Sequence, residues 1–410
     1  MRIEIDPELV EHYIMKLGTF GAYGDTGVWR VVYSPEWVGA MDQYAAWCGD
    51  AGLTVRRDTV GNLWGVLKGT EGGKSIVSGS HMDTQRPGGR YDGALGALAG
   101  LIAIGALKKQ FGTPKRTLEA VAFCEEESSR FPTTNFWGSS AIVGRIKPGA
   151  AETIKGYADE TVADAMRSVG LDPARIGESR RDDIDTFLEL HVEQGPILEH
   201  GGYPVAVVDA ITGIRHKKVT LKGVQNHAGA FPMDLRKDPM AGFAEIASGL
   251  IDNAHRMGRP AVTTIGRIAV DPNFPSVVPG NVEFVVDARH PNEAVRQEMY
   301  ARHDAFMRGV AARRGLDITI EQLLDHAACP SDPGLVKLLH RAAEKQGVRV
   351  FQMASGAGHD SQQMAAIAKV AMIFVRSKDG RSHTQEEFSS IEDIVQGIRV
   401  LAAGMHELAY

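Results

Sequence analysis

A histidine and an aspartate two residues apart, His81 and Asp83, follow the apolar segment Ser75–Gly79. Side chains two apart at the end of a strand point the same way. Asp83 can therefore accept a hydrogen bond from one ring nitrogen of His81 while the other nitrogen faces a metal ion. A surface pair is the simpler interpretation of these two residues taken alone.

Carboxylates lie next to two further apolar segments. Asp92 directly precedes Ala94–Leu107, where its charge would meet the positive end of a helix dipole, and a helix cap explains it equally well. Three glutamates, Glu125–Glu127, follow Leu118–Cys124. Adjacent carboxylates repel unless water, a proton or a cation relieves them. A metal would use one as a ligand and leave another free to deprotonate a metal-bound water molecule.

Two more histidines follow apolar segments: His191, in Leu188–Val192, and His383, after Val370–Val375. Each alone is as well explained as a surface or core histidine. All candidates, however, lie at the exits of predicted strands, which is where α/β folds bind ligands.

The five candidate ligands are enough to form two metal sites. If Asp92 bridges two ions, His81 and His191 complete one site, and Glu127 and His383 complete the other. Imidazole with carboxylate suits zinc, manganese, cobalt or nickel.

The elements that must position these residues alternate between strands and helices. Apolar strand segments are predicted at Asn62–Leu67, Ser75–Gly79 and Leu118–Cys124, and a buried helix at Ala94–Leu107. Strands that are apolar on both faces and alternate with helices predict an α/β sheet.

From about residue 213 the pattern changes to strand, helix, strand, strand, helix, strand. The segments are Arg215–Lys222, Pro239–Arg256, Ala261–Val270, Val282–Arg289, Asn292–Arg314 and Asp317–Leu323. This βαββαβ order is typical of a ferredoxin-like unit. We expect a catalytic α/β domain, residues 1–212 and 327–410, interrupted by a ferredoxin-like domain, residues 213–326.

Charge and cysteine content argue against several classes of protein. The 410 residues include 45 Lys and Arg against 51 Asp and Glu, so the basic excess that nucleic acid binding requires is lacking. Three scattered cysteines predict no disulfide framework and favour a reducing cytoplasm. The longest apolar run, Ala94–Leu107, is shorter than the roughly 18 residues of a membrane span, and the amino terminus lacks the apolar core of a secretory signal.

Seven motifs, in one order along the chain, resemble a known family. They are Gly79–Thr84, Gly89–Gly93, Glu126–Glu127 with Ser129–Phe131, His191–Pro196, Asn226–Gly229, Ser355–Asp360 and Ser382–His383. Together they resemble the amidohydrolase branch of the M20 metallopeptidases, which contains N-carbamoyl-L-amino acid hydrolases, allantoate amidohydrolases and β-ureidopropionases. The similarity extends over nearly the whole chain.

The resemblance implies two divalent ions per subunit, Zn²⁺ or Mn²⁺, with Co²⁺ or Ni²⁺ as alternatives. The implied ligands are His81, Asp92, Glu127, His191 and His383. Glu126 is implied as the general base, with Asp83 beside His81 in the catalytic machinery, and Glu125 is the additional glutamate. The reaction expected of such a site is attack of a metal-bridging hydroxide on a ureido or related amide carbon.

The resemblance also implies a homodimer formed by the inserted domain, in which His227 reaches the active site of the partner subunit and stabilises the oxyanion. Gln194 and Arg289 match substrate-binding positions. Arg289 would hold a substrate carboxylate through a bidentate fork.

Two residues depart from the family's pattern. Ser276 stands where the family usually has asparagine, and Arg381 precedes Ser382–His383 where an apolar or small residue is expected. A shorter hydroxyl leaves room beside Arg289, and a guanidinium near the metals favours a further anionic or carbonyl group on the substrate. Alternatively, Arg381 pairs with Asp379 or Glu386 and never faces the pocket.

We therefore predict metal-dependent hydrolysis of a non-peptide C–N bond in an N-carbamoyl amino acid, ureido or allantoate-like substrate. Two alternatives stay open. One is an exopeptidase or aminoacylase acting on an ordinary amide, which the form of the motif His191–Pro196 disfavours. The other is a catalytically silent metal-binding dimer, which the intact base Glu126 disfavours.

Overall fold

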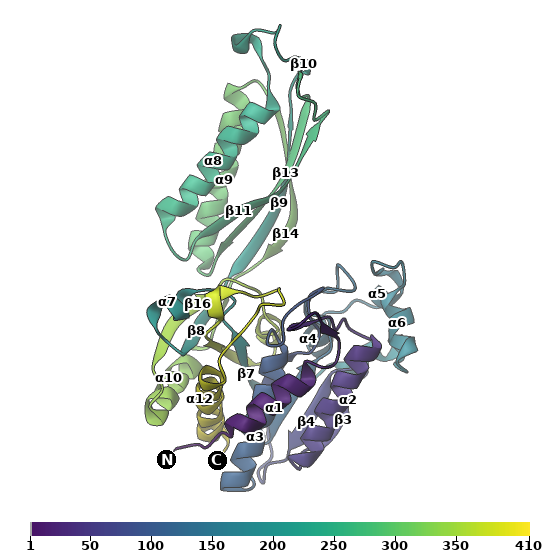
Figure 1. Ribbon diagram of the computed structural model, residues 1–410, viewed down its shortest axis with the longest axis vertical. Helices are drawn as coiled ribbons and strands as arrows, with labels where there is room; N and C mark the ends of the chain where they lie inside the picture. Colours follow the sequence, from purple (N-terminus) through teal and green to yellow (C-terminus); the bar gives the residue numbers. More distant parts are fainter. Residues whose placement is uncertain (1) are drawn as a thin grey trace. The chain divides into compact units, whose positions relative to one another are not determined.

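Four adjacent parallel strands with almost wholly buried side chains form the centre of a nine-stranded sheet. The computed structural model describes residues 2–410, and Figure 1 draws its helices and strands. In spatial order the four strands are β17 (Lys369–Val375), β7 (Ile184–Val192), β5 (Ser75–His81) and β6 (Leu118–Phe123). Burial on both faces explains their unbroken apolar sequences.

Antiparallel strands extend this sheet at both edges. Beside β6 lie β4 (Leu63–Leu67) and β3 (Thr54–Arg57), and beside β17 lies β8 (Val205–Ile211), which pairs with β15 (Cys329–Pro330) and β16 (Val350–Ser355). A separate hairpin joins β1 (Ala22–Tyr23) to β2 (Gly27–Val28).

Long helices cover the sheet. The buried helix α3 (Ala94–Phe111) packs against β5, β6 and β7, and α12 (Ile391–Ala409) packs against α3 and β17. Asp6 caps α1 (Pro7–Leu17) and Ser34 caps α2 (Pro35–Asp50), each with proline in the first turn. The remaining helices around this sheet are α4 (Trp137–Ile142), α5 (Ala150–Thr153), α6 (Val162–Ser168), α7 (Ile197–Gly201), α10 (Pro333–Gln346) and α11 (Ser361–Met364), with 3₁₀ turns at Pro173–Ser179 and Lys378–Gly380.

A second sheet belongs to the middle of the chain. Its strands are β9 (Gly213–Lys222), β11 (Val262–Asp271), β13 (Asn281–His290) and β14 (Asp317–His326), in the antiparallel order β11-β13-β9-β14. Helices α8 (Pro239–Met257) and α9 (Glu293–Arg313) pack on it, around a core that includes Val219, Leu250 and Phe284. A short ladder pairs β10 (Asn226–His227) with β12 (Val277–Val278), and a 3₁₀ turn lies at Met233–Leu235.

Contacts divide the chain into two compact units. The first unit comprises the chain up to Asp209 with Ser331–Met353 and Gly358–Tyr410, and the second unit comprises Ala210–Pro330 with the short segment Ala354–Ala357. The predicted mixed α/β fold with a large sheet is confirmed, and so is the βαββαβ order. The predicted domain boundaries, residues 213 and 326, stay predictions.

Helix α3 is long and apolar enough to cross a membrane, by its length and composition alone. In the folded chain 67% of it is buried, and it packs against three strands and against α12. The apolar sequence is therefore explained by its place in the core, as predicted for Ala94–Leu107.

Candidate metal centre

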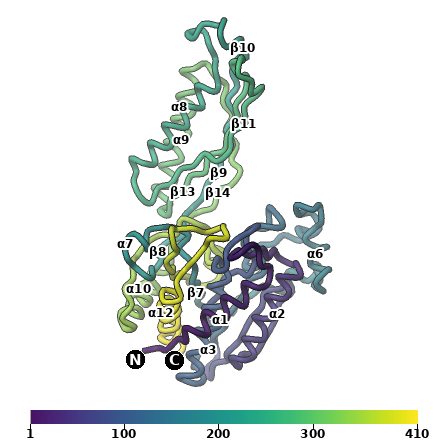
Figure 2. Tube along the Cα trace, viewed as in Figure 1, coloured from purple at the N-terminus to yellow at the C-terminus, as the bar shows by residue number. Residues whose placement is uncertain are grey.

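The parallel strands bring the candidate ligands to one edge of the central sheet. The last residue of β5, His81, pairs in register with Phe123, the last residue of β6, so that Glu125–Glu127 emerge beside it. His191 pairs in register with Phe374 of β17. The segment after β17, drawn yellow in Figure 2, carries His383, whose ring lies against Asp92, two residues before α3.

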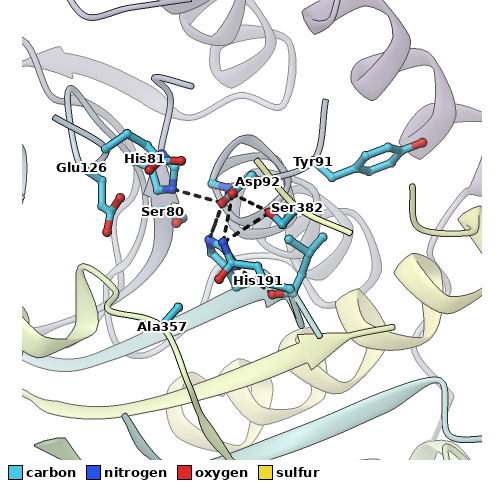
Figure 3. Close-up of polar contacts among 12 residues, drawn as sticks. Ser80, His81, Tyr91, Asp92, Glu126, His191, Ala357 and Ser382 are labelled. Carbon is cyan, nitrogen blue, oxygen red and sulfur yellow. Dashed lines mark hydrogen bonds and ion pairs between the residues drawn. The ribbon is translucent and has the colours of Figure 1, made fainter. Parts of the chain in front are cut away.

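The two carboxylate oxygens of Asp92 face different histidines. Its Oδ1 lies 3.6 Å from Nε2 of His81 and 3.2 Å from Nε2 of His191 (Figure 3). Its Oδ2 lies 3.3 Å from Nε2 of His383, and that nitrogen is 3.5 Å from Oε1 of Glu127. The five side chains thus form two groups that share Asp92: one with His81 and His191, the other with Glu127 and His383.

These donors fit a pair of divalent cations. Each group offers three imidazole or carboxylate ligands, which suits zinc or manganese. Oε1 of Glu127 is buried and has no hydrogen-bond partner among residues 2–410. A buried carboxylate oxygen without a partner is costly, and a cation would satisfy it. Gly93 is required here as well, because a Cβ at this position would lie 2.2 Å from the ring of His81.

Proton affinities in the cluster are strongly shifted. Burial would raise the pKa of Asp92, but hydrogen bonds from His191, His383 and His81 outweigh it and lower that pKa well below its usual range. The hydrogen bond to Asp92 raises the pKa of His383 to about 9. Burial and the charge of Asp92 raise the pKa of Glu127 to about 7. The cluster therefore attracts positive charge, as a cation site must.

Asp83 is fully buried, and its carboxylate contacts both His81, at the end of β5, and the segment Glu126–Glu127. Its Oδ1 lies 3.3 Å from Nδ1 of His81 and accepts a hydrogen bond from the backbone of Glu126 at 3.0 Å. Its Oδ2 accepts one from the backbone of Glu127 at 3.1 Å. Asp83 thus fixes the ring of His81, as its spacing suggested, and also holds the turn that carries both glutamates.

Glu126 and Glu125 have different surroundings. A carboxylate oxygen of Glu126 lies within 4.8 Å of ligand atoms of His81 and Glu127, and burial raises its pKa well above the usual value, although the charge of His81 opposes this. Glu125 is fully buried and belongs to none of the candidate metal groups found among residues 2–410.

The predicted substrate residue Gln194 lies in the same cluster. Its Nε2 donates to Oδ2 of Asp92 at 3.0 Å. Gln194 and His383 both have positive φ, 58° and 55°, a strained conformation for residues other than glycine that is often found at functional sites. Arg381 is exposed, and its charge contributes to lowering the pKa of Glu386 after the hydrogen bonds that Glu386 accepts from Thr384 and its own backbone.

His227, Ser276 and Arg289 belong to the second unit. His227 and Ser276 are neighbours, because His227 pairs with Val277 and the backbone of Ala228 donates to the carbonyl of Ser276. Arg289 lies at the opposite end of β13, which begins at Asn281 just after this ladder. Eight residues of strand span about 27 Å. Within one chain Ser276 and Arg289 therefore lie far apart, and the expected place of Ser276 beside a substrate held by Arg289 stays a prediction.

Three residues that hold the cluster were not predicted in this role. Ser382 donates its hydroxyl to Oδ2 of Asp92 at 2.8 Å, and Glu387 accepts from the backbone of Tyr91 and Asp92. Gln85 donates to Glu127. Ser382 belongs to the motif Ser382–His383 and Gln85 directly follows the motif Gly79–Thr84, which is the signal that the sequence offers for them. The hydrogen bond from the backbone of Asp92 to Glu387 joins residues 295 apart in sequence, so no local sequence pattern indicates it.

Comparison with known proteins agrees with this geometry. Residues 77–407 match the model of peptidase family M20/M25/M40. The chain is 39% identical over 404 residues to allantoate amidohydrolase of Escherichia coli (strain K12), covering 98% of each. It is 36% identical to N-carbamoyl-L-amino acid amidohydrolase of Geobacillus stearothermophilus, covering 99% of each.

The fold is likewise similar to that of a hydantoinase/carbamoylase family amidase from Burkholderia ambifaria. The two chains superpose with a TM-score of 0.93 at 31% identity over 100% of this chain and 99% of the other. The family match covers residues 77–407, and the relatives and the fold agree over nearly the full length. The chain therefore belongs to peptidase family M20/M25/M40, a family of hydrolases.

Proposed function

We propose that this chain hydrolyses a non-peptide C–N bond in a small ureido or N-carbamoyl compound that carries a carboxylate. The relatives named for allantoate and for N-carbamoyl-L-amino acids support this choice, since both are ureido compounds. A cytoplasmic location and an assembly of two subunits are part of the proposal.

The observation that carries the proposal is the pair of ligand groups around Asp92. Oδ1 of Asp92 faces His81 and His191 while Oδ2 faces His383, and this arrangement supports the proposal that Asp92 would be shared by two ions. We propose His81, Asp92 and His191 as ligands of one ion and Asp92, Glu127 and His383 as ligands of the other. Two such ions, Zn²⁺ or Mn²⁺, would polarise the substrate carbonyl and lower the pKa of a water molecule.

Glu126 is the proposed general base. Its backbone is fixed by Asp83, and its carboxylate lies beside the candidate ligands without belonging to either group around Asp92. It would accept the proton of the attacking water molecule and pass it to the leaving nitrogen. Gln194, held against Asp92, would contact the substrate from the other side.

The proposed substrate-binding residues of the second unit support an assembly of two chains. Arg289 would bind the substrate carboxylate, and His227 and Ser276 would contact the reacting group. Arg289 lies near the end of β13, whereas His227 and Ser276 lie by the β10–β12 ladder, just before β13 begins at Asn281. The eight residues of strand from Asn281 to Arg289 span about 27 Å. One copy of this unit cannot bring both to one small substrate, so we propose that His227 and Ser276 act on the site of the partner subunit.

Two assays, one of released ammonia and one of released free amino acid, test the proposed function, because N-acetyl amino acids and dipeptides yield no ammonia on hydrolysis. Metal-loaded protein would be assayed against allantoate, N-carbamoyl-β-alanine, several N-carbamoyl-L-amino acids and the matching N-acetyl amino acids and dipeptides. We expect release from at least one ureido compound and no turnover of the N-acetyl compounds and dipeptides. Preferential hydrolysis of those ordinary amides would instead identify an aminoacylase or exopeptidase.

A further inference from the structure

The side-chain amide of Gln85 holds one oxygen of Glu127. Nε2 of Gln85 donates to Oε2 of Glu127 at 2.7 Å, and the side chain of Glu127 is only 6% exposed. The other oxygen, Oε1, has no hydrogen-bond partner among residues 2–410 and lies 3.5 Å from Nε2 of His383. The amide therefore distinguishes the two oxygens, and the one it leaves without a bond is the one that faces the candidate ligand His383.

The segment that carries Gln85 is itself anchored. The backbone N–H of the buried Arg30 donates to the hydroxyl of Thr84 at 2.9 Å, and the backbone N–H of Thr84 donates to the carbonyl of Arg30 at 3.0 Å. The next residue, Arg86, donates from Nη1 to the carbonyl of Ser129 at 3.2 Å. Two consecutive side chains, those of Gln85 and Arg86, thus hold the segment that begins with Glu127.

A neutral amide is well suited to orienting a metal ligand. A carboxylate fixed through one oxygen presents the other in a defined direction and loses less side-chain freedom when an ion binds. Lysine at the same place would neutralise the carboxylate and compete with the ion, whereas glutamine leaves the full negative charge on Glu127.

We propose that Gln85 is a positioning residue that raises the affinity of one ion only, the ion held by Asp92, Glu127 and His383. The inference rests on the metal centre of the proposed function. No hydrogen bond joins Gln85 to His81 or His191 in the part of the chain that the structure describes, residues 2–410. The affinity of the ion held by those two histidines should therefore not depend on it.

Metal titration of Gln85→Met tests this directly, because methionine has a similar size and no donor. Metal-free wild type and variant would be titrated with Zn²⁺ against a chromophoric chelator. For wild type we expect two bound ions. For the variant we expect one dissociation constant to rise about 10- to 100-fold and the other to stay unchanged.

Further variants assign the affected ion. In a His383→Ala background, Gln85→Met should have no further effect on the remaining ion. Gln110→Met is the matched control, since the amide of Gln110 donates only to the carbonyls of Glu4 and Ala106. Thermal unfolding of the metal-free variants verifies that they are folded.

Two results would overturn the inference. If Gln85→Met leaves both dissociation constants unchanged, or shifts both equally, Gln85 does not position Glu127 for one ion. If wild-type protein itself binds fewer than two ions, the proposed metal centre is wrong, and that failure is visible before any variant is compared.

Discussion

Asp287 holds the guanidinium of Arg289 through two of its nitrogens. Nε of Arg289 donates to Oδ1 of Asp287 at 2.9 Å and Nη2 donates to Oδ2 at 2.8 Å, while Nη1 donates to the carbonyl of Gly356 at 2.9 Å. His216 lies 3.1 Å from the same Oδ2. With three N–H groups engaged, one N–H on each terminal nitrogen stays available, which is the number that a carboxylate of the substrate needs.

Loss of the hydrogen bonds between Asp287 and Arg289 should weaken substrate binding. Asp287→Asn keeps the shape of the side chain and removes its charge, so Arg289 would be held less firmly. We expect KM for a carboxylate substrate to rise about tenfold with kcat changed by less than about twofold. In an Arg289→Ala background the same substitution should have no further effect, and a full additional loss there would show that Asp287 does not act through Arg289.

Mixing two inactive variants tests whether His227 acts on the partner's site. A heterodimer of His227→Ala and Glu126→Gln chains contains one site with both residues intact. Each heterodimer should regain about half the activity of a wild-type dimer, and random exchange of equal amounts about a quarter overall. Activity that stays at background after subunit exchange, verified by mass spectrometry, would place His227 in its own chain's site.

The role of Arg381 in substrate choice can be separated from a purely structural one. We predict that Arg381→Ile selectively lowers kcat/KM for an N-carbamoyl substrate with a second anionic group, because a cation near the reacting group is lost. The comparison substrate is N-carbamoyl-leucine. An equal effect on both substrates would indicate that Arg381 serves only its neighbour Glu386.

His303 should make the stability of the second unit depend on pH. Burial lowers its pKa to about 4, with Asp304 opposing and Lys217 adding to the shift. The unfolded chain, with a histidine pKa of about 6.5, binds the proton more readily. The contribution is therefore present above pH 6.5 and is lost as pH falls towards 4, by up to about 3 kcal/mol.

Urea unfolding of wild type and His303→Leu between pH 7 and pH 4 measures this contribution. The variant should lose less stability than wild type over that range. His255→Leu, on the exposed side of the neighbouring helix, is the matched control. Identical pH dependence of His303→Leu and wild type would contradict the expectation.

Much of the candidate site could be predicted because its residues lie close in sequence to recognisable apolar strand segments. His81, Asp83, Glu126 and Glu127 follow buried apolar strands directly, and parallel strands bring such ends together. The contacts of Gln85 and Glu387 could not be predicted in this way, since they depend on how loops fold back on the sheet. The hydrogen bond between Glu387 and the backbone of Asp92 joins residues 295 apart, so neither residue spacing nor composition indicates it.

The separation of Ser276 from Arg289 within one chain could not be predicted for a similar reason. A motif match indicates which residues serve one site, but it does not say whether they come from one chain. Only the register of β12 and β13 shows that Ser276 and Arg289 lie at opposite ends of the same unit. Strand β8 (Val205–Ile211) was also missed, because a short apolar run next to a loop does not by itself indicate an antiparallel strand.

In the proposed mechanism Glu126 supplies the base, while the two groups around Asp92 hold the metals. The most direct measurement combines metal analysis and ammonia release for Glu126→Gln, because Glu126 also lies within reach of His81 and Glu127. We predict two ions per chain, as in wild type, and turnover lower by about a thousandfold or more. Loss of an ion on this substitution would make Glu126 a ligand, and unchanged turnover would place the base elsewhere.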